Sequence, residues 1–327
     1  MKKTFTTLGM LSALSLAARG GETVLAKLLI QKGADPSERD GNSNTPLLYA
    51  IWQNNPELAR FYLDQGVSVE STFMQNARPL MIAAGLGNRD LTEYFCSKGA
   101  DLEARDGGGS TALTYAARTD KVELVDYLLQ KGADGNTRDN MGRTPLMVAS
   151  ATGSVNAVRA LIAAGVDVDA QDSLSRSALR WAVEKRHRDA VQLLIDRKAA
   201  PDAADSKGVT PLMRASSLGE EKVAAALLDA GADPNARSKG NVTPLMFAAL
   251  TGQGAVMRML LERGAKVDAR DERGRSALFY AAGRGFTGIT RLLLAKGADS
   301  SLTDKFHKSA LDYAIEADKA LVVELLK

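Results

Sequence analysis

A six-residue phrase that returns every 33 residues constrains this sequence more than any other feature. It is clearest as TPLMVA, which starts at Thr144, and its neighbours TALTYA and SALRWA start at Thr111 and Ser177. The third residue is Leu and the sixth is Ala in all ten copies. A fixed period of this length indicates a repeat array, in which each unit packs against its neighbours.

Each copy carries the signals for two helices and a turn. The Thr or Ser that opens the phrase is a helix N-cap, and the Pro that often follows fits the first helical turn, where its missing N–H costs nothing. A Gly such as Gly153 ends this helix, and the apolar segment 122–130 is typical of the second helix. A GAD turn, for example Gly132 to Asp134, leads into a polar hairpin and the next cap.

The same phrase predicts the core. At about 100° per residue, the Leu two positions after the cap and the small residues five and six positions after it fall on one helix face. We therefore expect the Leu and Ala columns to be buried between neighbouring repeats.

The unit length, the TPL phrase, the Gly between the helices and the GAD ending resemble ankyrin repeats over essentially the whole chain. The resemblance implies an all-α fold of helix-turn-helix repeats with β-hairpin turns, stacked as an ankyrin-repeat solenoid. One row departs from the family, which usually has His after TPL. Here Met fills that row in four copies, as at Met147, and Arg180 fills it in one. We expect apolar packing by Met to replace the hydrogen bonds of that His.

We expect a single array over residues 1–327. It would consist of an N-terminal capping repeat (1–39), eight internal repeats (40–303) and a C-terminal capping repeat (304–327).

Residues 1–18 have a second interpretation. Two lysines, an apolar run and small residues are typical of a secretory signal. The phrase SALSLA at Ser12 nevertheless keeps the repeat phase, which favours a capping repeat. A cytoplasmic location is favoured, and a periplasmic or secreted one follows if residues 1–18 are a signal. No stretch is long and apolar enough to predict a membrane span.

Composition argues against several kinds of chemistry. The net charge is +3, from 42 basic and 39 acidic side chains, which is too balanced to indicate nucleic acid by itself. One Cys excludes an internal disulfide framework, and only two His accompany it. Metal clusters and Cys–His nucleophile pairs are therefore not expected. We predict no catalytic residue, no cofactor and no metal.

The fourth residue after the cap lies opposite the predicted core. Six of its ten copies are aromatic, although aromatic residues make up only 5% of the chain, and Trp52 adds another ring one turn above Tyr49. In the resembled family the stacked first helices form a concave wall. Tyr and Trp mark binding hot spots, so this row predicts a docking surface. Packing between neighbouring repeats is the alternative, and it stays open here.

Two departures from the pattern sharpen this prediction. Around Trp181 the sequence is expected to gather a basic patch that could receive an acidic protein surface or, less readily, nucleic acid; a solvated basic face is the alternative. The basic residues are Arg176, Arg180, Lys185, Arg186 and Arg188. In the hairpin before Arg78, Phe73 replaces the usual Asp beside Met74. This predicts either an apolar pair exposed at the hairpin tip, which we call the apolar fingertip, or local packing of the two side chains.

The resulting hypothesis is a monomeric, non-catalytic protein–protein interaction module. It would bind a folded protein through the concave helix face and the hairpin tips, with nucleic acid a less favoured partner. The alternative is a secreted or periplasmic inhibitor that occludes the active cleft of a partner enzyme. The candidate partner-binding residues are Tyr49, Trp52, Phe73, Met74, Tyr115, Arg118, Arg180, Trp181, Lys185, Arg214, Phe247, Tyr280 and Arg284.

Overall fold

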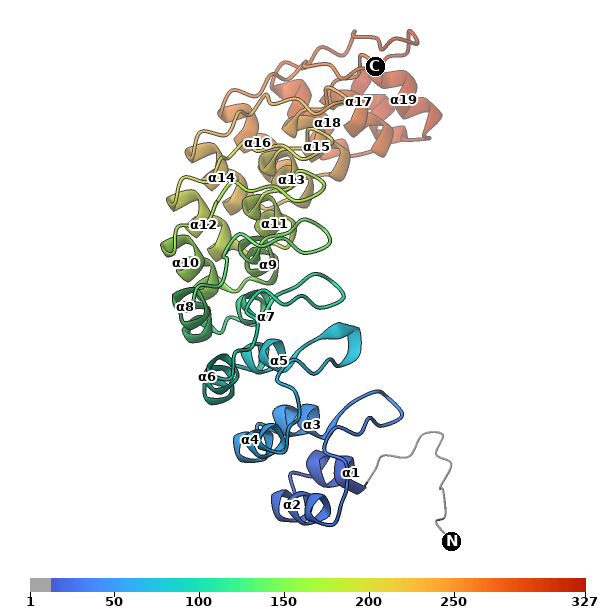
Figure 1. Ribbon diagram of the computed structural model, residues 1–327. Helices are drawn as coiled ribbons and strands as arrows, with labels where there is room; N and C mark the ends of the chain where they lie inside the picture. Colours follow the sequence, from blue (N-terminus) through green and yellow to red (C-terminus); the bar gives the residue numbers. More distant parts are fainter. Residues whose placement is uncertain (1–12) are drawn as a thin grey trace. The chain divides into compact units, whose positions relative to one another are not determined.

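The computed structural model describes residues 13–327, which form twenty α-helices in ten consecutive pairs (Figure 1). The predicted all-α architecture of paired helices is confirmed. Residues 1–12, which carry most of the signal-like segment predicted at 1–18, lie outside the described residues.

The first helix of each pair begins at or just after the predicted cap. The first helices are α1 (Ala13–Arg19), α3 (Pro46–Trp52), α5 (Pro79–Leu86), α7 (Ala112–Arg118), α9 (Pro145–Thr152), α11 (Ala178–Glu184), α13 (Pro211–Leu218), α15 (Pro244–Thr251), α17 (Ala277–Arg284) and α19 (Ala310–Glu316). The second helices are α2 (Thr23–Gln31), α4 (Pro56–Asp64), α6 (Arg89–Ser97), α8 (Val122–Gln130), α10 (Val155–Ala163), α12 (Arg188–Asp196), α14 (Glu221–Asp229), α16 (Gly254–Glu262), α18 (Thr287–Ala295) and α20 (Ala320–Leu326). One 3-10 turn, η1 (Met74–Asn76), lies in a hairpin.

The chain divides into two compact units. Unit 1 extends to Ala149 and adds Ser154–Asp167, whereas unit 2 comprises Ser150–Gly153 and Val168–Lys327. Within each unit the first helices pack on one another, as α5 does on α7 and α13 on α15. The second helices form the neighbouring row, and the hairpins project beside the first helices (Figure 1).

The helix ends follow the predicted signals. The Thr210 hydroxyl accepts the N–H of Met213 at 3.3 Å, and the Thr243 hydroxyl caps α15 in the same way. Gly219 ends α13 with φ of 71°, a left-handed conformation that costs glycine little. In the equivalent turn after α11 the left-handed residue is Arg186, with φ of 62°.

The core consists of the predicted columns. Leu113 and Ala116 are fully buried on α7, and the equivalent residues of the other repeats are buried up to α17. On α19 the Leu is half-buried. The row that usually holds His in the resembled family is filled by buried Met in four repeats, which confirms the predicted packing. The Met213 sulfur also accepts the N–H of Thr210 at 3.4 Å, so this side chain packs and caps at once.

A hairpin Asp organises most of the loops between helix pairs. In the hairpin before α17, the Asp271 carboxylate accepts the backbone N–H groups of Arg273 and Arg275 at 2.8 and 2.9 Å. Six further hairpins repeat this arrangement, around Asp40, Asp106, Asp139, Asp172, Asp205 and Asp304. Over residues 13–327 the one β-bridge joins Thr303 to Ser309. The carboxylate hydrogen bonds act together with a backbone hydrogen bond across each hairpin, such as that from the Asp271 N–H to the Arg275 carbonyl at 2.9 Å.

No helix within residues 13–327 has both the length and the apolar character that a membrane span requires.

Candidate partner-binding site

Five of the six aromatic residues at the fourth position after the cap contact the hairpin Asp of their own repeat. The Tyr280 hydroxyl donates to Asp271 Oδ2 at 2.7 Å, nine residues earlier in the chain. The indole N–H of Trp181 donates to Asp172 Oδ2 at 3.1 Å in the same way. We call this contact the aromatic–Asp clasp. It recurs between Tyr49 and Asp40, Tyr115 and Asp106, and Tyr313 and Asp304.

The clasp changes the interpretation of the aromatic row. Tyr49 and Trp181 are only 7% and 8% exposed, and Tyr115 and Tyr280 are half-buried. The prediction that this row stands open opposite the core is therefore wrong for Tyr49 and Trp181. The reason is that each hairpin folds back and its Asp holds the polar end of the ring, so the packing alternative accounts for these two positions.

In unit 1 the remaining predicted residues are separated. Trp52 is 43% exposed, and its ring stands edge-on to Tyr49 with the centroids 5.8 Å apart. Met74 is 57% exposed, but Phe73 is buried beneath it. The expected apolar fingertip thus consists of Met74 alone, because the Phe73 side chain takes the inward position that Asp has in other hairpins. The Arg118 guanidinium lies 4.4 Å from the centre of the Tyr115 ring.

In unit 2 the structure brings five of the predicted residues together around one hollow of about 550 Å³. We call it the α11–α15 hollow, because first helices α11, α13 and α15 and two hairpins line it. The predicted lining residues are Arg180, Trp181, Lys185, Arg214 and Phe247, and the others are Leu174, Arg176, Glu184, Asp205, Ser206, Lys207 and Val209. The predicted residues of α17, Tyr280 and Arg284, do not line it.

The hollow forms where the aromatic–Asp clasp is interrupted. On α13 the clasp position holds Arg214, so no ring covers Asp205. On α15 it holds Phe247, which has no hydroxyl, and the matching hairpin residue is Ser238. Asp205 Oδ2 instead lies 3.7 Å from Arg180 Nη2. The missing ring on α13 leaves space between Trp181 and Phe247.

Charged groups form the base of the hollow. Arg180 occupies the row that Met fills in other repeats, and its side chain is 8% exposed. Its Nη1 lies 2.6 Å from Glu184 Oε2, and the other oxygen of Glu184 accepts a hydrogen bond from Arg214 Nη2. One carboxylate therefore joins guanidinium groups of two adjacent repeats.

The bridge affects protonation of Glu184. Burial alone disfavours the charged carboxylate, but hydrogen bonds from Arg214 and Arg180 outweigh burial and lower the pKa of Glu184. Glu184 is thus ionised at neutral pH.

The lining of the α11–α15 hollow carries five basic and two acidic side chains. The rim residues Lys185 and Lys207 are exposed, and neither ammonium group forms a salt bridge within residues 13–327. The hollow therefore presents positive charge.

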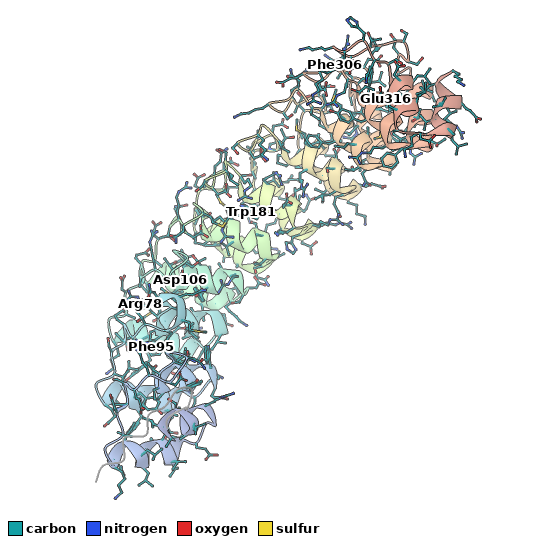
Figure 2. The ribbon with its side chains drawn as sticks, turned by 90° about the vertical axis from the view of Figure 1, so that its right-hand side faces the viewer. Arg78, Phe95, Asp106, Trp181, Phe306 and Glu316 are labelled. Atoms are coloured by element: carbon teal, nitrogen blue, oxygen red, sulfur yellow. The ribbon has the colours of Figure 1, made fainter. Side chains whose placement is uncertain are left out.

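The predicted basic patch is only partly present around Trp181. Figure 2 marks the place of Trp181 in the chain. The Arg176 guanidinium lies 4.0 Å from the Trp181 ring centre. Arg186 and Arg188 do not join it, so the prediction is wrong for these two. The chain reverses direction at Arg186, and both guanidinium groups turn to Glu220, at 3.7 and 2.8 Å.

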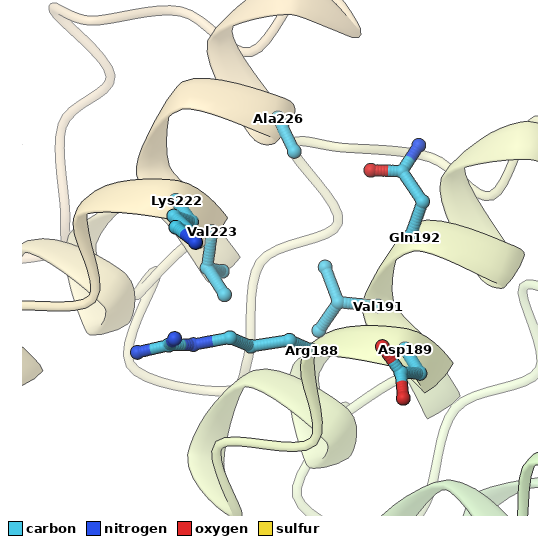
Figure 3. Close-up of a pocket in the computed structure, with 7 residues that line it drawn as sticks. All are labelled: Arg188, Asp189, Val191, Gln192, Lys222, Val223 and Ala226. Carbon is cyan, nitrogen blue, oxygen red and sulfur yellow. The ribbon is translucent and has the colours of Figure 1, made fainter.

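A second, smaller hollow of about 330 Å³ lies between second helices α12 and α14 (Figure 3). Val191 and Val223 are almost fully buried there. Arg188, Asp189 and Lys222 add charges of both signs. None of the candidate partner-binding residues lines it.

Seven lining residues of the α11–α15 hollow were not among the candidate partner-binding residues, and they include Leu174, Glu184, Asp205 and Lys207. A signal for them exists in the sequence. An Asp nine residues before an aromatic residue recurs, as in Asp271 and Tyr280, and Arg214 breaks this pattern. Reading the two positions as a pair would have marked Arg214 together with Val148, which follows Asp139 by nine residues and also lacks a ring.

The chemistry available here is anion binding. Within the described part of the chain, no group of three or more His, Cys, Asp or Glu side chains is placed to hold a metal ion. Guanidinium and ammonium groups recognise carboxylates and phosphates through charge-assisted hydrogen bonds.

Comparison with protein families agrees with the helix pairs. A model of three ankyrin repeats matches residues 80–172, 164–238, 208–271 and 245–327, and a model of many ankyrin repeats matches residues 14–61. No curated protein matches the sequence. Ankyrin repeats are generally protein-binding modules and are typically non-catalytic. Because these matches span nearly all of its length, the chain belongs to the ankyrin repeat family.

Proposed function

We propose that this chain is a non-catalytic module that binds a folded protein partner, and that the partner docks at the α11–α15 hollow. The observation that carries this proposal is the hollow itself. It extends over three consecutive repeats and combines unpaired positive charge with apolar contact area.

The rim suits a protein interface. Leu174 is 51% exposed at a hairpin tip, beside the two rim lysines, Lys185 and Lys207. Interfaces typically combine an apolar centre with a polar rim that also steers the approach of an oppositely charged partner.

The hairpins at the rim are also ordered before binding. The Ser206 N–H donates to the Leu174 carbonyl at 2.9 Å, and the Lys239 N–H donates to the Lys207 carbonyl at 3.0 Å. Each tip is thus tied to the next. A surface that is already ordered loses less conformational entropy when it binds.

The two histidines and the one cysteine of the sequence occupy positions that support a structural role. The His187 ring bonds the Ala151 carbonyl at 3.1 Å, and the other histidine, His307, lies in a hairpin with φ of 60°. Cys96 is half-buried, and burial raises the pKa of its thiol. A neutral thiol is a poor nucleophile, which supports a binding function.

Charge reversal at the rim tests the proposal. Partners would be recovered from the native cell extract with the wild-type chain and with Lys185→Glu/Lys207→Glu. We expect the double variant to lose at least about tenfold in affinity for a docked partner, because rim charges steer association. The control is Lys222→Glu/Lys296→Glu, which reverses two exposed lysines of the second-helix row. Equal binding of the same partners by both double variants would contradict docking at the hollow.

A further inference from the structure

Glu184 has an unusual position in the α11–α15 hollow. It lies in the last turn of α11, and its carboxylate bridges Arg180 and Arg214 at the base. Its own side chain is 29% exposed, so it can rotate outward without unfolding α11.

Arg180 is built into the fold more firmly than the carboxylate that binds it, whereas Arg214 and Glu184 are about equally exposed. The Arg180 side chain is more than nine-tenths buried, in a row where other repeats have Met. Its Nε atom and that of Arg214 are both buried and have no hydrogen-bond partner among the described residues. Buried guanidinium groups need a carboxylate nearby, because an unpaired buried charge is costly. That carboxylate need not come from this chain.

We propose that the α11–α15 hollow binds a carboxylate side chain from an acidic segment of the partner, which displaces Glu184 from Arg180 and Arg214. This inference rests on the proposed function and names the chemistry of the docking site. In the free chain Glu184 occupies the place of the ligand. Glu184 thus competes with the partner's carboxylate. The apparent affinity of the chain for the partner is reduced because the partner binds only the fraction of molecules in which Glu184 has left the two arginines.

Several features favour an acidic peptide over nucleic acid. Planar guanidinium groups match a carboxylate with paired hydrogen bonds. Base stacking would require an open ring, but Trp181 is buried and Arg176 covers it at 4.0 Å. Leu174 and Val209 add apolar contact beside the cations. The ligand that fits is a segment in which acidic residues alternate with apolar ones.

The test measures binding of a labelled hexapeptide of alternating Glu and Leu to the full chain, with a Gln and Leu hexapeptide as the probe control. We expect Glu184→Gln to bind the acidic peptide about fivefold more tightly than wild type, because the competitor loses its charge. We expect Arg214→Gln to bind it about tenfold more weakly, because a guanidinium is lost. Arg263→Gln is the matched control: it breaks an exposed pair with Asp229 at 2.8 Å, outside the hollow, and should bind like wild type.

Each outcome bears on a stated part of the inference. Equal or weaker binding by a folded Glu184→Gln, repeated with Glu184→Ala, would overturn internal competition. A second outcome is that no variant binds the acidic peptide, while Lys185→Glu/Lys207→Glu still loses the natural partner. This would overturn the proposal that the partner supplies a carboxylate and would leave the proposed function standing. Tighter binding of a single-stranded oligonucleotide that competes with the peptide would overturn the choice of an acidic peptide.

Discussion

Two repeats of unit 2 use the same hairpin carboxylate in different ways. In the repeat of α17, Asp271 is clasped by Tyr280, and the Arg275 guanidinium bonds both the carboxylate and the Tyr280 hydroxyl, at 2.8 and 2.9 Å. In the repeat of α13 the clasp position holds Arg214, and Asp205 keeps its two backbone hydrogen bonds but gains no ring. The first repeat is closed by its aromatic side chain, whereas the second is open.

The comparison shows how one position either closes the surface of a repeat or leaves it open. A ring at the clasp position satisfies the hairpin Asp and covers the surface around it, which stabilises the repeat. An Arg at the same position leaves space and turns a charged group toward Glu184. Binding surfaces of repeat proteins use positions that the stacking does not require, and Arg214 occupies such a position.

The largest expected difference concerns the two carboxylates themselves. We expect Asp271→Ala to lower the free energy of unfolding by about 3 kcal/mol, because it leaves the hydroxyl of half-buried Tyr280, a guanidinium and two backbone N–H groups without their acceptor. Asp205→Ala removes fewer buried contacts and should cost about half as much. Urea unfolding followed by circular dichroism measures both. Equal losses would show that the clasp adds nothing to the hairpin.

The clasped carboxylate should also affect how the stability of the fold depends on pH. Burial disfavours ionisation of Asp271, but hydrogen bonds from Tyr280 and Arg275 outweigh it and hold its pKa below the usual value. A lowered pKa stabilises the fold above the unfolded-state value, about 3.9, and this contribution is lost as pH falls through the folded-state pKa.

Asp271→Asn should therefore flatten the acid limb of the stability curve by about 1 kcal/mol between neutral and low pH. Urea midpoints measured at a series of pH values give the slope. An unchanged slope in the variant would exclude Asp271 as a contributor.

The smallest effect is expected from building a clasp where none exists. In the repeat of α15, Ser238 and Phe247 replace the Asp and the Tyr together. The double variant Ser238→Asp/Phe247→Tyr should be more stable than the sum of the two single changes predicts. We expect this interaction free energy to be about 0.5–1 kcal/mol. A double-mutant cycle of unfolding free energies measures it. Strict additivity of the two changes would show that the nine-residue spacing alone does not create the contact.

Much of the fold was predictable because it depends on local signals that recur. Thr210 and its following Pro predict a helix start, and Gly219 predicts its end, as the structure confirms. The 33-residue period then fixes which Leu and Ala residues face a neighbour, since equivalent positions stack. The same reasoning predicted basic residues around Trp181, and three of them, Arg176, Arg180 and Lys185, line the hollow with it.

The details of the site were less predictable. Helix angles place Trp181 opposite the core, but they do not show that the hairpin folds back and buries its ring. Angles also cannot tell that Arg188 turns to Glu220 whereas Arg180 turns to Glu184. Arg188 takes its partner from the next repeat, whereas Arg180 takes its partner from its own helix, and helix angles alone do not decide between the two.

The sequence alone determined the family, the helix pairs and the buried columns, because each follows from a pattern within one repeat and its fixed return. The tertiary structure alone decided which rings are closed by a hairpin carboxylate and where the surface opens. Those outcomes require the side chains of adjacent repeats and of the intervening hairpin to meet. Nothing in its own repeat distinguishes Arg214 in the sequence, and it becomes part of the hollow only because Asp205, Glu184 and Arg180 line the same space.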